Sequence, residues 1–181
     1  LKDINRYDTS IWSGIYRRNF IITNGIECNE SQGAAFQDIG FLQQVFWKTD
    51  KAYYTEKKFY NYCTDREDSS TNQGNGLAFA YQEYQFLLSS KIQSVQECEN
   101  KNCIYERMAD VFEENLKKII VQRKEEKNKD IIQWFVNILC QKERENVIHR
   151  SYLHSLMDDP EKWIYQNRQK YCSKRMYVED L

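Results

Sequence analysis

The sequence contains very little proline and glycine for its length. Its 181 residues include one proline and six glycines, whereas average usage would give about nine prolines and about twelve glycines. All six glycines precede residue 77, and the single proline is Pro160. Because both residue types interrupt regular structure, their scarcity predicts an all-α protein with long helices in its second half. Turns are expected mainly in the first 76 residues.

Long apolar runs and an excess of one charge are also missing. No run approaches the roughly 20 apolar residues that a membrane-spanning helix needs, so we expect a protein that is at most peripheral to a membrane. The net charge is −1, which provides no basic surface for nucleic acid. The chain begins with Leu1 rather than Met, so a processed or trimmed N-terminus is expected.

The sequence lacks a recognisable catalytic or metal-binding pattern. His149 and His154 are five residues apart, so on a helix they project from different faces instead of pairing at i and i+4 as zinc ligands do. There is no nucleophile elbow and no glycine-rich loop after a strand. We therefore predict that the protein is not an enzyme and that it binds no cofactor and no metal.

Six cysteines are the chemically distinctive residues. Zinc ligation is disfavoured because no C-x-x-C pair occurs. Reduced thiols in a helical core are one alternative, and disulfides between helices in an oxidising compartment are the favoured one. The six are Cys28, Cys63, Cys98, Cys103, Cys140 and Cys172.

Changes in composition divide the chain at a polar stretch. Residues 1–35 carry three of the glycines and predict a loop-rich arm, whereas apolar residues at three- and four-residue steps predict that residues 36–63 are helical. Residues 64–76 are polar and read as a linker. The expected organisation is an N-terminal part (1–75) and a cysteine-framed helical domain (76–181).

The helical domain is expected to contain an antiparallel hairpin. Residues 104–122 and 131–139 have apolar residues at helical spacing and are joined by a polar connection. Cys103 begins the first helix and Cys140 ends the second, so both fall at the open end and predict a disulfide. A bridge from Cys98 to Cys172 outside it is a further hypothesis. Downstream, Asp158-Asp159-Pro160-Glu161 is typical of a helix start.

Aromatic residues make up 14% of the chain, more than a small helical core requires. Amphipathic rings are enriched where partners cover a surface. Together with the arm, this excess predicts a protein that acts through contact area. The residues expected to contact partners are Trp12, Trp47, Tyr53, Tyr54, Tyr60 and Tyr62.

The cysteine segments resemble one known family. Glu97-Cys98 is followed after a short gap by Cys103-Ile104-Tyr105-Glu106, residues 130–132 precede a basic and acidic stretch at 140–145, and residues 171–176 form a basic end. Over residues 84–176 these motifs resemble the PDSW subunit of mitochondrial NADH:ubiquinone oxidoreductase (complex I). The gap between the first two cysteines is shorter here than in that family.

The resemblance implies an accessory subunit of complex I. Such a subunit would lie on the intermembrane-space side of the mitochondrial inner membrane, held by helical disulfides and contacting other subunits of a large membrane-bound complex, without a cofactor of its own. Two alternatives remain open from the residues alone. One is a structural subunit of another mitochondrial inner-membrane assembly, and the other is a secreted, disulfide-stapled helical binding module with Asn29 glycosylated, since Asn29-Glu30-Ser31 is an acceptor sequence.

Overall fold

The structure is a computed structural model that describes residues 10–31, 36–61, 75–92, 103–159 and 162–168. These described residues form helices and connecting segments and include no β-strand, which confirms the all-α prediction. None of the helices within these ranges is long and apolar enough to span a membrane.

The chain divides into two compact units, Leu1–Ile104 and Tyr105–Leu181. The division lies after the predicted boundary at residues 75/76, so the first unit includes the helix that follows the polar linker. We call Leu1–Ile104 the N-terminal unit and Tyr105–Leu181 the C-terminal unit.

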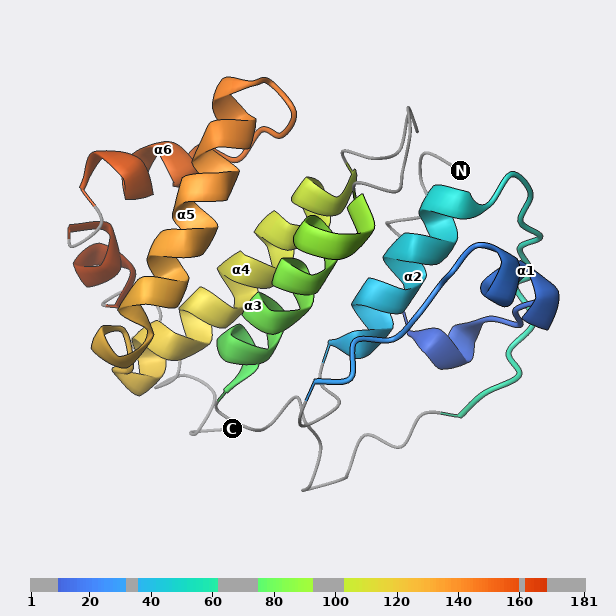
Figure 1. Cartoon of the computed structure of the whole chain (residues 1–181). Helices are drawn as coiled ribbons and strands as arrows, with labels where there is room; N and C mark the ends of the chain where they lie inside the picture. The colour runs from blue at the N-terminus through green and yellow to red at the C-terminus, as the bar shows by residue number, and fades with distance from the viewer. Residues whose placement is uncertain (1–9, 32–35, 62–74, 93–102, 160–161, 169–181) are drawn as a thin grey trace. The chain divides into compact units, whose positions relative to one another are not determined.

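The N-terminal unit is built around one helix. Its elements are the 3-10 turn η2 (Ile11–Ser13), α1 (Arg18–Thr23), α2 (Gln37–Lys48), α3 (Gly76–Phe86) and the π-helical turn η3 (Leu87–Lys91) (Figure 1). A small core of Ile26, Phe41, Leu42 and Val45 gathers partly buried residues from η2 and α1. The predicted arm therefore packs on α2, with Tyr16 edge-on to Phe41 at a ring-centroid distance of 5.1 Å.

The helix predicted within residues 36–63 is shorter than expected. Helix α2 ends at Lys48, Thr49 adopts an extended backbone, and residues 51–61 form no regular structure. The residues between Tyr54 and Phe59 are Thr-Glu-Lys-Lys, so a helix here would have no apolar side chain on its middle turn to bury. Since packing of an apolar face supplies most helix stability, the prediction is wrong beyond Lys48.

The C-terminal unit contains the predicted hairpin. Helix α4 (Cys103–Gln122), whose first two residues belong to the N-terminal unit, and α5 (Lys129–Arg144) are joined by the 3-10 turn η5 (Glu126–Asn128). The rings of Phe112 and Phe135 stack 5.0 Å apart, and Lys142 Nζ lies 5.0 Å from the Tyr105 ring. These two contacts confirm that α4 and α5 are antiparallel (Figure 1).

The hairpin helices end without glycine. Arg123 (φ 56°) and Asn146 (φ 57°) adopt the left-handed conformation that commonly terminates a helix. After each, a backbone N–H returns to the preceding turn: Lys124 donates to Ile119 O (3.1 Å) and Val147 donates to Lys142 O (2.9 Å). The scarcity of glycine in the second half therefore did not prevent tight helix ends.

Two further helical segments close the C-terminal unit. Helix α6 (Ser151–Asp158) is followed by helical residues 162–168. Asp159 Oδ1 accepts a hydrogen bond from the Lys162 N–H (2.9 Å), which is the N-cap contact that the acidic start signal predicted. Arg150 Nη2 pairs with Glu106 (2.6 Å) and Asp110 (2.9 Å) of α4, and Tyr152 Oη donates to Ala109 O (3.0 Å).

Candidate functional site: exposed aromatic segment and buried carboxylate

The exposed large hydrophobic side chains are distributed unevenly between the two units. Of the eight among the described residues, seven belong to the N-terminal unit and one to the C-terminal unit. A folded chain that leaves large apolar side chains in water at one part of its surface marks that part for contact. They are Trp12, Ile15, Ile22, Tyr53, Tyr54, Phe59 and Tyr60, with Tyr165 in the C-terminal unit.

Residues 51–61, named here the docking segment, carry four of these side chains. The segment runs without a turn or bend, and every residue in it is exposed. Tyr53 and Phe59 expose 94% and 81% of their surface. The segment has three lysines and one glutamate. A stretch that presents aromatic rings and basic groups together can provide contact area and electrostatic orientation.

The 3-10 turn η2 holds one end of the docking segment. The ring centroids of Trp12 and Tyr60 are 5.9 Å apart, although the two residues are far apart in the sequence. Within the segment, Thr55 Oγ1 accepts a hydrogen bond from the Lys57 N–H (3.2 Å). These contacts restrict the segment while leaving its rings exposed.

The structure leaves most of the predicted partner-contact residues exposed. Trp12, Tyr53, Tyr54 and Tyr60 are exposed, whereas Tyr62 lies outside the described residues. The prediction of partner contact does not hold for Trp47. This side chain is only 6% exposed, because α2 is buried on most of its faces. Phe59 was missed, although the adjacent Tyr60 was the signal that could have identified it.

The predicted bridge between Cys103 and Cys140 is absent from the structure. Cys140 is a buried reduced thiol, and burial raises its pKa to about 11. The register that places Phe112 against Phe135 puts residue 107 opposite Cys140, four residues along α4 from Cys103, which is about 6 Å of helix axis. Cys98 and Cys172 lie outside the described residues.

A buried carboxyl group lies in the N-terminal unit. Glu83 of α3 is 1% exposed, and neither of its oxygens has a hydrogen-bond partner among the described residues. Desolvation raises the pKa of Glu83 to about 7; Asn29 partly opposes this shift and Asp38 reinforces it. The Asn29 amide donates instead to Gln82 O (3.4 Å). Sequence reasoning missed Glu83 because glutamate is rarely buried without a partner.

The Glu83 carboxyl lies directly against α2. A Cβ atom added at Gly40 would overlap it, so the absence of a side chain at position 40 makes room for this acid. The buried Gln43 Nε2 of α2 also lacks a hydrogen-bond partner among the described atoms. An unpaired buried carboxyl is favoured in its neutral form, so the burial of Glu83 against α2 favours the protonated acid.

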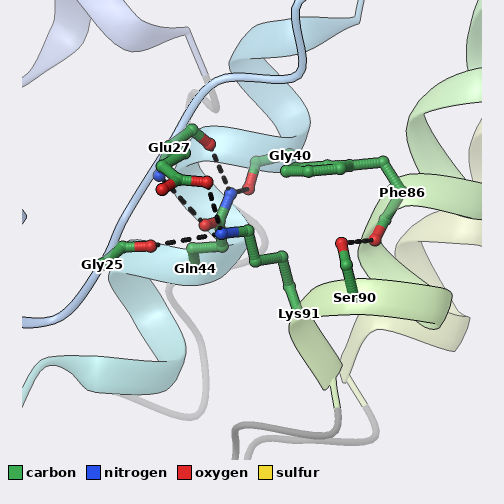
Figure 2. A network of polar contacts seen from close by, with 7 residues as sticks. All are labelled: Gly25, Glu27, Gly40, Gln44, Phe86, Ser90 and Lys91. Carbon is green, nitrogen blue, oxygen red and sulfur yellow. Dashed lines mark hydrogen bonds and ion pairs between the residues drawn. The ribbon is translucent and has the colours of Figure 1, made fainter.

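A polar network connects residues 25–27, which follow α1, with helix α2 and the turn η3, as Figure 2 shows. Gln44 Nε2 donates to Glu27 O (2.7 Å) and to Gly40 O (3.0 Å), and Gln44 Oε1 accepts from the Glu27 N–H (3.2 Å). Lys91 Nζ pairs with Glu27 Oε2 at 2.8 Å and donates to Gly25 O at 3.3 Å. The network holds the arm in place and has the character of a structural support.

In the part of the chain that the structure describes, no group of three or more histidine, cysteine or acidic side chains could hold a metal ion.

Comparisons with protein families, with curated proteins and with solved structures found no match to this chain.

Proposed function

We propose that the protein is a non-catalytic accessory subunit of mitochondrial complex I, on the intermembrane-space side of the membrane arm, which acts by binding other subunits. The observation that carries the contact role is the docking segment, in which Tyr53, Tyr54, Phe59 and Tyr60 are exposed together.

The size of the docking segment suits a protein interface. Each phenylalanine or tyrosine can bury about 150–250 Å², so four rings approach the roughly 800 Å² that one partner contributes to a standard interface. Aromatic residues are enriched in such interfaces. The three lysines of the segment favour a partner surface with acidic residues at its rim.

Complex I is proposed as the assembly because of the resemblance of residues 84–176 to the PDSW subunit. The helical hairpin is compatible with a helical accessory subunit. The secreted alternative is less favoured because Asn29, whose glycosylation it requires, is half-buried and its amide contacts Gln82 O. A glycan on that nitrogen would lie at the contact between the arm and α3.

The assembly role is tested by replacing rings of the docking segment in the full chain. We expect tagged wild-type protein to migrate with complex I in a native separation of solubilised mitochondrial membranes, and the Tyr53→Ser/Phe59→Ser variant to migrate as free protein. Tyr165→Ser is the matched control, because it removes an exposed ring from the C-terminal unit. Migration of the wild type with a different assembly would contradict the choice of complex I.

The contact role itself has a separate test. If the wild type belongs to no larger particle, or if the double variant assembles as well as the control, the docking segment does not bind a partner. An intrinsic activity lost on replacing one carboxylate or histidine would also contradict a non-catalytic role.

A further inference from the structure

The N-terminal unit has a second exposed surface, of different composition from the docking segment. Residues 10–26 contain Arg17 and Arg18 and no aspartate or glutamate, although the whole chain has a net charge of −1. Within this stretch Ile15 is fully exposed and Ile22 is 61% exposed. Exposed aliphatic side chains therefore occur here beside cations, in a stretch that itself contains no carboxylate.

Helix α1 separates its buried and exposed residues. Phe20 and Ile21 pack against the core around Phe41, whereas Arg18 and Ile22 are exposed and, four residues apart, lie on the same side of the helix. Ile15 and Arg17 precede the helix and are also exposed. These four exposed residues lie close together in the sequence, between residues packed on the core, and are named the isoleucine–arginine face: Ile15, Arg17, Arg18 and Ile22.

The isoleucine–arginine face is supported from behind. Tyr16, between its residues, packs edge-on against Phe41, and Asn24 Nδ2 donates to Phe20 O at the end of α1 (2.9 Å). The first carboxylate after the face, Glu27, is paired with Lys91. The surface is therefore held in a defined position, and its positive charge is not offset by the nearest downstream acid.

We propose that the isoleucine–arginine face binds the surface of an anionic lipid bilayer. Isoleucine side chains can enter the boundary between headgroups and acyl chains, while neighbouring arginines remain at the level of the lipid phosphates. The positive charge of the face is complementary to anionic headgroups. The face has no ring of the kind that anchors protein interfaces, which distinguishes it from the docking segment. This proposal does not rest on the proposed function.

The experiment uses the purified full chain and two kinds of vesicle, phosphatidylcholine alone and phosphatidylcholine mixed with phosphatidylserine, with binding measured by co-sedimentation. We expect binding to the mixed vesicles only, weakened by added salt because exposed charges are screened. Replacing each arginine with alanine should weaken binding about fivefold. Ile15→Ser/Ile22→Ser should weaken it about tenfold or more.

Controls distinguish this surface from the docking segment. Tyr53→Ser/Phe59→Ser should retain wild-type vesicle binding. The replaced isoleucines and arginines are exposed, so these variants should keep the helical circular-dichroism signal of the wild type.

Three results would overturn the proposal. They are equal binding of the wild type to both kinds of vesicle, no binding to either, and loss of binding in the docking-segment variant with retention in the isoleucine variant. None of them bears on migration with complex I, so failure here and failure of the proposed function can be told apart.

Discussion

The two units differ in how far their large apolar side chains are buried and their polar groups are paired. In the C-terminal unit the buried rings stack, Arg150 pairs with two carboxylates of α4, and Asp159 caps the next helix. In the N-terminal unit seven large hydrophobic side chains are exposed and an acid is buried without a hydrogen bond from the described residues. The comparison shows that large apolar side chains are mostly buried in the C-terminal unit and more often exposed in the N-terminal unit, which is why the proposed contact surfaces lie in the N-terminal unit.

The largest effect is expected in the core of the C-terminal unit. Phe112 is fully buried and stacks on Phe135, so Phe112→Ala should lower the free energy of unfolding by about 4 kcal/mol. Urea denaturation monitored by helical circular dichroism measures this change. A loss below about 1 kcal/mol, the range of surface substitutions, would mean that the stack does not hold the hairpin together.

The second largest effect is a pH dependence of the free energy of unfolding, which arises from Glu83 of the N-terminal unit. Unfolded Glu83 ionises near 4.5, but folded Glu83 keeps its proton until about pH 7. Between these values the folded state binds more protons, so the contribution of Glu83 to stability is greatest below pH 4.5 and falls as the pH rises to about 7. The loss from this group is about 3 kcal/mol. Urea denaturation across this range should show it in the wild type.

Glu83→Gln is the control for this pH dependence. Because glutamine cannot ionise, the fall in stability between pH 4.5 and 7 should shrink by about the same amount. Urea denaturation of the wild type and of the variant, followed by helical circular dichroism at each pH, measures both profiles. Identical pH profiles for the wild type and the variant would show that Glu83 is not buried as described.

A smaller effect is expected at Gly40. The methyl group that Gly40→Ala introduces would overlap the Glu83 carboxyl, and overpacking of this kind costs about 2 kcal/mol. The same substitution in a Glu83→Ala background should cost less, because the overlapping group is gone. Additive effects of the two substitutions in a double-mutant cycle would show that positions 40 and 83 do not touch.

The smallest effect is expected at Arg150. Its two carboxylate partners are each more than a third exposed, so Arg150→Met should destabilise the C-terminal unit by about 1 kcal/mol or less. Thermal unfolding at low and high salt measures it. A loss of several kcal/mol would mean that the ion pairs of Arg150 with Glu106 and Asp110, and not the apolar core, hold α6 to α4.

The sequence predicted the elements whose residues repeat at helical spacing. The hairpin of α4 and α5 was predictable because Met108, Phe112 and Ile119 recur along one face, and the Asp159 cap because its start signal is local. The predicted Cys103–Cys140 bridge is absent from the structure, because the register between two helices depends on how side chains such as Phe112 and Phe135 interlock, which helical spacing alone does not specify.

The features of the N-terminal unit were less accessible from the sequence. Docking of the arm on α2 depends on contacts such as Glu27 with Gln44, across 17 residues. The burial of Glu83 depends on the missing side chain at Gly40. The exposure of Ile15 and Ile22 could not be predicted from the sequence, because isoleucine is normally buried. The exposure of tyrosines in the docking segment was predictable from their number and amphipathic character.

Hydroxyl-radical footprinting tests the central claim, that the N-terminal unit is the contact-forming unit, most directly. The oxidation of side chains in the purified chain is compared with that in the native assembly by mass spectrometry. We expect Tyr53, Tyr54, Phe59 and Tyr60 to be strongly oxidised in the free chain and protected in the assembly, while Tyr165 is oxidised equally in both. Unchanged oxidation of the docking segment together with protection of Tyr165 would contradict the account.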